Sequence, residues 1–254
     1  MKIILITQDE PFFLAENLDY LINRLPEGSS IVACCLLGPS PFGRKEGMLK
    51  KIKKTIAIFG FRFFAYYSFR FFRCKLLGGS RVRGVLEKHG ITILELSQSI
   101  NSRSSLETLR QYDPDLLLSV AGNEIFRKDL INLAPKGCIN LHTAMLPKYR
   151  GLMPSFWVLK NSEQMTGVSV FFVDEGVDSG PIISQRAVEI GGRTQEQLIR
   201  DTKKIGMDLI VDAINKIESG EYTLIPNDRS QMSYYTFPTR KDVKAFLKAG
   251  KKFF

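Results

Sequence analysis

Short apolar runs that lack polar alternation recur along the chain, and segments with helical periodicity separate most of them. Runs of strand length occupy 2–7, 31–37, 91–96 and 115–120. A strand without polar residues on either face is typical of a parallel sheet that helices cover on both sides. The pattern therefore predicts an α/β fold with a mostly parallel central sheet flanked by helices.

The second half of the chain has a different pattern. A short apolar strand at 138–141 precedes two β-rich runs, 167–173 and 182–190, which we expect to pair as a hairpin. An amphipathic helix is expected over 194–219, where Gly220 ends it. We assign residues 1–220 to one domain and residues 221–254 to a short C-terminal appendage.

Residues 44–75 form a basic and aromatic segment. They hold ten Lys or Arg and one acid, so they contribute +9 to a net charge of +10. Nine of the 27 aromatic residues lie between 59 and 72, and Arg62 and Arg70 among them argue against a membrane-spanning helix. We predict a helical insertion with three open interpretations: rings packed on the sheet or in a subunit interface, a helix on an anionic membrane surface, or a patch that binds nucleic acid. Because the rings surround the helix without forming one stripe, burial on several sides is favoured.

Several motifs of common enzyme classes are missing. The sequence has no phosphate-binding loop, no glycine fingerprint for nicotinamide cofactors and no nucleophile turn of the serine hydrolases. The two His are far apart and the four Cys show no paired spacing, so we expect no metal site and buried thiols. The N-terminus shows no export signal, which predicts a cytoplasmic protein, and the basic segment leaves open a peripheral position at a membrane surface.

Polar side chains that suit carbonyl chemistry are concentrated in 140–151 and 173–182. Asn140 and His142 are two residues apart at the end of a strand, so both point to one side of the sheet. At the carboxyl edge of a parallel sheet, an amide can donate to an oxyanion and an imidazole can donate or move a proton. Asp178, in a glycine-rich turn, could bring a carboxylate to His142 and fix its tautomer. The three types together suit addition of an amine to a carbonyl carbon, although Asn140 could also cap a turn and Asp178 could satisfy its own loop.

The motifs NLHTAMLPKYRG (140–151), TGVSVFFVDEGVDSGPII (166–183) and QRAVEI (185–190) resemble the folate-dependent formyltransferases. The similar branch contains the methionyl-tRNA and sugar N-formyltransferases, and glycinamide ribonucleotide formyltransferases are more distant. The resemblance covers about residues 80–220 and implies a Rossmann-like formyltransferase fold that uses 10-formyltetrahydrofolate without a metal. It implies catalytic roles for Asn140, His142 and Asp178. The residues that match pterin-binding segments are Leu118, Ser119, Val120, Ala121, Gly122, Asp174, Glu175, Gly176 and Val177.

The acceptor follows less directly from the resemblance. The methionyl-tRNA enzymes carry a further C-terminal barrel, and only 35 residues follow residue 219, so we expect a small amine acceptor, preferably an amino sugar attached to a nucleotide. Tyr149, Arg150 and Gly151 are the predicted acceptor-binding residues, with Arg150 on an acceptor phosphate unless it is solvated or ion-paired. Ala144 stands where the family commonly has Ser, which leaves the acceptor or the local loop geometry open to difference.

Other functions remain as alternatives. Initiator tRNA is the alternative acceptor, which the sequence disfavours, and segment 44–75 would then substitute for the absent barrel. A hydrolase of formyl-folate, or a folate-binding module without transfer activity, is a second alternative. A homo-oligomer is compatible with the sequence.

Overall fold

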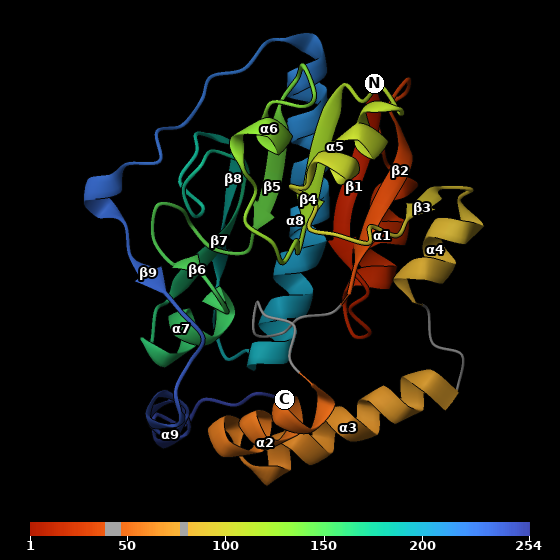
Figure 1. The fold of residues 1–254 in the computed structure, drawn as a ribbon. Helices are drawn as coiled ribbons and strands as arrows, with labels where there is room; N and C mark the ends of the chain where they lie inside the picture. The colour runs from red at the N-terminus through yellow and green to blue at the C-terminus, as the bar shows by residue number, and fades with distance from the viewer. Residues whose placement is uncertain (39–46, 77–80) are drawn as a thin grey trace.

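The structure is a computed structural model that describes residues 1–38, 47–76 and 81–254 (Figure 1). A seven-stranded sheet with the order β3-β2-β1-β4-β5-β7-β8 forms its centre. The parallel strands are β1 (Lys2–Gln8), β2 (Ser30–Leu37), β3 (Thr92–Leu94), β4 (Leu116–Val120) and β5 (Cys138–His142). β7 (Met165–Phe172) is antiparallel to both β5 and β8 (Ile182–Glu189). The predicted mostly parallel α/β sheet and its terminal hairpin are confirmed.

Helices cover both faces of the sheet. On one face, Ile3, Leu118 and Leu141 share a hydrophobic cluster with α1 (Leu14–Ile22), α4 (Val82–Lys88) and α8 (Gln195–Ser219). On the other, Ile4 and Leu117 pack with α5 (Arg103–Arg110) and α6 (Lys128–Ile131). Since successive residues of a strand point to opposite faces, each buried strand serves both clusters and needs apolar residues throughout.

The strand order reverses at β1. The chain runs from β1 outward through β2 to β3 and then returns to place β4 on the other side of β1. The loops that follow β1 and β4 therefore diverge, and ligands of open α/β sheets bind at such a point. β5 ends at the same edge of the sheet, beside β4.

The helix α8 packs against the face of β5 that carries Ile139 and Leu141. It begins at a capping box in which Thr194 and Gln197 each accept from the other's backbone N–H, and it ends at Gly220 with φ 73°, as predicted. A side chain at Gly206 would place its Cβ 2.7 Å from Leu141 Cδ2. A larger residue there would therefore push α8 away from the strand that carries Asn140 and His142.

The basic segment is helical, as predicted, and it folds into a hairpin of α2 (Met48–Phe59) and α3 (Phe61–Leu76). Its residues 44–46 lie outside the described residues. In Figure 1 the hairpin lies at the bottom, beyond the carboxyl edge of the parallel strands. Tyr66 stacks on Phe254 with ring centroids 3.8 Å apart. The predicted burial of the rings on several sides is wrong for part of the set, because one face of α3 packs and the opposite face is exposed. The exposed rings are Phe61, Phe69, Phe71 and Phe72.

The residues 221–254, predicted as an appendage, pack closely against the rest of the chain. β9 (Tyr234–Tyr235) pairs in parallel with β6 (Arg150–Gly151). α9 (Arg240–Lys248) buries Val243 and Phe246 in a third hydrophobic cluster, shared with α7 (Pro154–Lys160). Phe253 joins this cluster while its carbonyl accepts a hydrogen bond from the backbone of α8. The division of the chain at residue 220 stays a prediction.

Among the described residues no helix combines the length and the apolar character needed to cross a membrane. All four Cys are free thiols: Cys34, Cys35 and Cys138 are buried, as predicted, and Cys74 is half-buried. Burial raises the pKa of the Cys35 and Cys138 thiols to about 12. These thiols are therefore protonated and unreactive at neutral pH.

Candidate active site

Asn140 and His142 leave the same face of β5, as predicted. Ile139 and Leu141 alternate with them and point the other way, into the cluster beneath α8. Asn140 is half-buried and lies in register beside Ser119 of β4. No described residue forms a hydrogen bond with the Asn140 side chain, so its amide is available to a ligand.

The His142 imidazole is held between two oxygen atoms. Nε2 donates to the backbone carbonyl of Tyr149 at 2.7 Å, because a carbonyl oxygen can only accept. Nδ1 lies 3.6 Å from Asp178 Oδ2, and the side chains of this pair are only 8% and 14% exposed. The hydrogen bond to the Tyr149 carbonyl therefore fixes the orientation of the ring, and the Asp178 carboxylate faces the other nitrogen at a distance longer than a hydrogen bond.

Asp178 is held in place by backbone from a different part of the chain. Its Oδ2 atom accepts from the Gly151 N–H at 2.8 Å, and its own backbone is left-handed, with φ 48°. Asp174, earlier in the same loop, instead accepts from the Gly176 N–H and the Ser179 hydroxyl. The first carboxylate therefore faces His142, whereas the second closes its own turn.

The predicted pterin-binding residues form two segments on either side of β5. In the first, Leu118, Ser119 and Val120 are buried within β4, and Ala121 (φ 58°) and the exposed Gly122 lead the chain out at the carboxyl edge. The second follows β7, and there Glu175 and Val177 are exposed while Asp174 and Gly176 are half-buried. Since β5 pairs with both β4 and β7, the two segments flank the end of the strand that carries Asn140.

The predicted acceptor-binding residues also organise the loop around the site. Burial raises the pKa of Tyr149, and its hydroxyl donates to Glu163 at 2.6 Å. Gly151 has φ 92°, and a Cβ there would collide with the carbonyl of Tyr235, so only glycine fits. The Arg150 side chain is buried, and its Nε atom has no partner among the described residues. Contact of these three residues with an acceptor stays a prediction.

Asn227 is a site residue that the sequence did not reveal. It lies after α8, just before a single turn of 3₁₀ helix (Arg229–Gln231). Its Oδ1 atom accepts from Arg150 Nη2 at 2.6 Å, and its Nδ2 atom donates to the carbonyls of Asp178 and Gly180, both at 2.9 Å. Asn227 thus ties the buried Arg150 to the loop that carries Asp178. Its Pro-Asn-Asp sequence indicates a turn, but no local pattern shows partners 47 to 77 residues away.

The loop after His142 is fixed from the neighbouring strands. Ala144 is fully buried, and its carbonyl accepts from the Ser169 hydroxyl at 2.7 Å. The same hydroxyl accepts from the Leu146 N–H and from Gln185 Nε2. Side chains of β7 and β8 therefore hold this loop in place, although Ala144 has no hydroxyl group to contribute.

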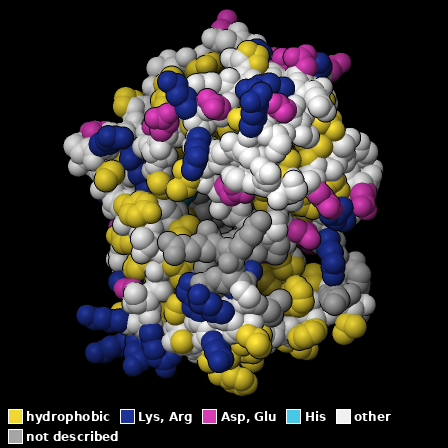
Figure 2. Space-filling model, in the orientation of Figure 1, with side chains coloured by type: hydrophobic (Ala, Val, Ile, Leu, Met, Phe, Trp, Pro, Cys, Tyr) yellow, Lys and Arg dark blue, Asp and Glu magenta, His cyan; other side chains and the backbone are white. Residues whose placement is uncertain are grey.

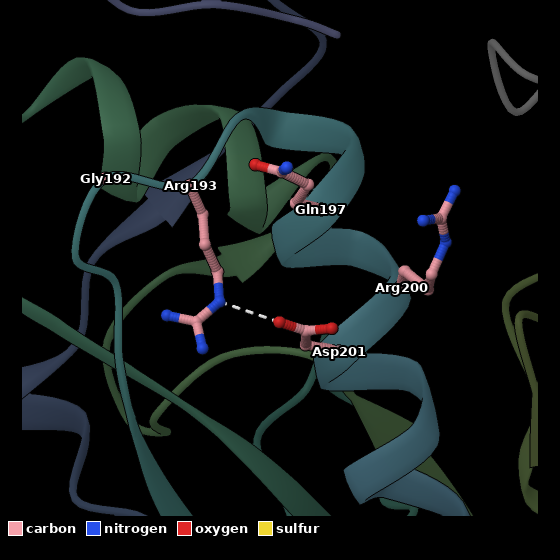
Figure 3. A pocket seen from close by; sticks show the side chains of 5 residues that line it. All are labelled: Gly192, Arg193, Gln197, Arg200 and Asp201. Carbon is pink, nitrogen blue, oxygen red and sulfur yellow. Dashed lines mark hydrogen bonds and ion pairs between the residues drawn. The ribbon is translucent and has the colours of Figure 1, made fainter.

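A hollow of about 370 Å³ at the start of α8 is separate from these residues (Figure 3). Its lining consists of Gly192, Arg193, Gln197, Arg200 and Asp201. Arg193 and Asp201 pair across it at 2.7 Å, and both side chains are more than a third exposed. None of the predicted site residues lines it. In the part of the chain that the structure describes, no three His, Cys, Asp or Glu side chains are grouped to hold a metal ion.

A protein-family comparison covers most of the chain. The model of the family described as formyl transferase matches residues 1–214. The chain belongs to the formyl transferase family. The matched part of the chain runs from β1 into α8, so it contains Asn140, His142 and Asp178. The family resemblance read from the sequence motifs is confirmed.

Two curated relatives of this chain are methionyl-tRNA formyltransferases. That of Kosmotoga olearia is 35% identical over 171 residues, which are 67% of this chain and 55% of the relative. That of Ruminiclostridium cellulolyticum is 28% identical over 242 residues, 95% of this chain and 66% of the relative. The chain spans about half to two thirds of the length of these relatives.

Solved structures share the fold at lower identity. Glycinamide ribonucleotide transformylase 1 of Symbiobacterium toebii is 19% identical, with a TM-score of 0.61 over 89% of this chain and 92% of that one. The N-formyltransferase of Helicobacter canadensis, in complex with folinic acid and dTDP-3-aminofucose, is 16% identical, with a TM-score of 0.58 over 98% and 80%. The predicted formyltransferase fold is confirmed.

Proposed function

We propose that this formyl transferase moves a formyl group from 10-formyltetrahydrofolate to a primary amine. One observation carries the proposal. The His142 imidazole faces the Asp178 carboxylate at 3.6 Å, on the strand face that also presents the unpaired amide of Asn140. Membership of the formyl transferase family supports it.

Asn140 stabilises negative charge in this proposal. When an amine adds to a carbonyl carbon, charge develops on the carbonyl oxygen, and an N–H donor placed beside that oxygen lowers the barrier by about 3 kcal/mol. Since no described residue occupies the Asn140 amide, no existing hydrogen bond must break before it can donate.

His142 and Asp178 handle the proton that the attacking amine must lose. Because Nε2 is engaged by the Tyr149 carbonyl, the proton moves at Nδ1, the nitrogen that faces Asp178. The carboxylate compensates the positive charge on a protonated ring, and the Gly151 N–H keeps that carboxylate in place.

Residues 118–122 and 174–177 would hold the folate donor. The exposed Gly122 and the half-exposed loop after β7 offer backbone groups on the two sides of β5, and the free amide of Asn140 fits a polar ligand between them. When bound, the donor would supply the formyl carbon to which the amine nitrogen adds. The bond from that carbon to the folate nitrogen would then break, and the proton that the amine loses would pass to this nitrogen, so that tetrahydrofolate leaves.

The comparisons favour a different acceptor from the one that the sequence favours. An amino sugar on a nucleotide is the preference from sequence, with initiator tRNA as the alternative. The two curated relatives are methionyl-tRNA formyltransferases, so we propose methionyl-tRNA as the first acceptor to test. A nucleotide-linked amino sugar is the second candidate, because the Helicobacter canadensis enzyme, which aligns with 98% of this chain, is in complex with dTDP-3-aminofucose.

An acceptor screen tests the proposal. The chain is incubated with 10-formyltetrahydrofolate and either methionyl-tRNA or a nucleotide-linked amino sugar, and mass spectrometry records the gain of one formyl group. His142→Ala and Asp178→Asn should abolish the gain, whereas the exposed Asn132→Ala should not. If formate is released at the same rate without any acceptor, the protein is a hydrolase of formyl-folate and the proposal of a transferase is wrong. If the chain binds the donor but formylates no amine, it is a folate-binding module without transfer activity.

A further inference from the structure

The hairpin exposes a stripe of apolar side chains. They recur along α3 at intervals of three or four residues, which places them on one side of the helix. The stripe consists of Phe61, Ala65, Phe69, Phe72 and Leu76. Its four large members are 70%, 66%, 59% and 81% exposed, in that order. Five apolar residues in a line on the surface of a helix call for a partner, because the stripe carries a continuous apolar face into water.

The opposite side of α3 is firmly attached to the rest of the chain. The ring of Phe63 lies 4.9 Å from that of Phe253, and the ring of Tyr67 lies 5.4 Å from that of Phe12. Arg70 pairs with the nearly buried Glu196 of α8 at 2.8 Å. The helix therefore has two apolar faces, of which one is packed, and exposure of the stripe does not come from a detached hairpin.

Positive charge surrounds the stripe. The helices α2, α3 and α9 carry twelve Lys or Arg and one acid, whereas the rest of the chain carries 24 Lys or Arg and 25 acids. The net charge of these helices is thus +11 and that of everything else is −1. Figure 2 shows hydrophobic side chains along the lower edge over α2 and α3, with Lys and Arg among them and a further group over α9. The exposed basic side chains include Lys53, Arg62, Arg73, Arg240, Lys241, Lys244 and Lys248.

We propose that the face formed by α2, α3 and α9 docks on an anionic lipid bilayer. The stripe lies among the acyl chains just below the headgroups, and the Lys and Arg side chains lie at the lipid phosphates. Nucleic acid would bind the Lys and Arg side chains through its phosphates. Leu76 and Leu49, which is 76% exposed, can neither pair with phosphates nor stack on bases, so nucleic acid would leave them in water. A second copy of this chain would bring one face of +11 against another. An anionic bilayer is the partner that matches both the stripe and its charge.

Docking in this way orients the candidate active site. The hairpin contacts the segment that directly follows β1: Cys74 Sγ lies 3.5 Å from the carbonyl of Pro11, and Tyr67 packs on Phe12. That segment lies at the carboxyl edge of the sheet, the edge at which β5 ends and His142 lies. The bilayer would therefore lie on the side of the molecule at which the site opens, whichever amine is formylated.

Vesicle co-sedimentation tests the proposal with the full chain. We expect binding to vesicles of phosphatidylglycerol and phosphatidylcholine, and little binding to phosphatidylcholine alone. Phe69→Ser with Phe72→Ser should lower the partition coefficient on the order of tenfold, because the stripe loses two large apolar groups. Lys53→Glu with Arg73→Glu should lower it at least as much at low salt, and high salt should remove that difference.

Matched controls alter the same residue types elsewhere on the surface. Met165→Ser with Leu224→Ser removes two exposed apolar side chains, and Arg110→Glu with Lys136→Glu reverses two exposed charges, so neither pair should change vesicle binding. Equal binding of the Phe69/Phe72 variant and its control would overturn the proposal. So would binding to tRNA without binding to vesicles, or a dimer that the Phe69/Phe72 changes dissociate in the absence of lipid affinity.

Discussion

At the scale of single residues, Asn140 differs from the other site residues because its side chain has no hydrogen-bond partner among the described residues. We expect Asn140→Ala to lower kcat about 100- to 1,000-fold, as loss of one oxyanion donor does, with a much smaller effect on the KM for the folate donor. Since no hydrogen bond is lost in the folded state, the free energy of unfolding should change by less than about 0.5 kcal/mol. Initial rates and thermal unfolding of the variant measure both, with the exposed Asn132→Ala as the control. Turnover near that of the unaltered chain would remove Asn140 from the chemistry.

Asn227 acts at the same scale but through position. Asn227→Asp keeps an acceptor for Arg150 and removes the two N–H donors to the carbonyls of Asp178 and Gly180. We expect a loss of about 1–3 kcal/mol in the free energy of unfolding and a lower kcat, because the loop that positions Asp178 is released. Asn227→Ala also removes the Oδ1 acceptor of the buried Arg150, whose Nη2 keeps the main-chain carbonyl of residue 227 at 3.2 Å, so the melting temperature of this variant should be lower still. Equal melting temperatures for the two variants would show that the bond to Arg150 contributes nothing.

At the scale of elements, α9 depends on a charged capping box. Burial acts to raise the pKa of Asp242, but hydrogen bonds from Thr239 and the ion pair with Lys160 at 3.2 Å outweigh it and hold the pKa below its ordinary value of 3.8. A carboxyl group with a lowered folded-state pKa stabilises the fold above its unfolded-state pKa, and this stabilisation is lost as the pH falls through the folded-state pKa. At pH 7, Asp242→Asn should therefore lower the free energy of unfolding by about 1 kcal/mol and lower the melting temperature with it. The difference in melting temperature between this variant and the unaltered chain should shrink below about pH 4.

Melting curves of Asp242→Asn and of the exposed control Asp129→Asn, recorded from pH 7 down to pH 3, measure this dependence. A difference between Asp242→Asn and the unaltered chain that stays constant over the whole range would contradict the assigned role of the charge.

The elements that sequence predicts best are those with local causes. The strand at 115–120 and the helix that ends at Gly220 follow from an apolar run, a cap and a left-handed glycine, and the structure has both. The stripe on α3 was missed because nine rings within 14 residues look buried, and only the packing of Phe63 and Tyr67 shows which face of α3 is used. The site divides in the same way. Asn140 and His142 share a strand face by periodicity, whereas the contribution of Asn227 depends on contacts between distant segments.

At the scale of the whole molecule, two hydrophobic clusters belong to the sheet and a third lies beyond its carboxyl edge. The third cluster joins α2, α7, α9 and the start of α8, with Phe59, Phe156, Leu198 and Phe246 as members. These residues are separated by up to 187 positions in the sequence (246 minus 59), so no local pattern could show that they form one core. The α2–α3 hairpin therefore packs in part on a core that contains no strand of the central sheet, and we expect the hairpin to loosen before the sheet does.

Phe253 is the residue on which this second core can be tested. Its ring lies 4.7 Å from Phe246 and 4.9 Å from Phe63, and only 6% of the residue is exposed. Phe253→Ala should lower the free energy of unfolding of the part that this cluster holds by about 3–5 kcal/mol, because removal of a large buried side chain leaves a cavity. In hydrogen exchange, the amides of α2, α3 and α9 should lose protection while those of β1, β4 and β5 keep theirs. Phe254→Ala, which removes a half-buried ring stacked on Tyr66, should have a smaller effect that is confined to α3. Equal loss of protection across the sheet would show that the molecule unfolds as one unit and that the hairpin has no separate core.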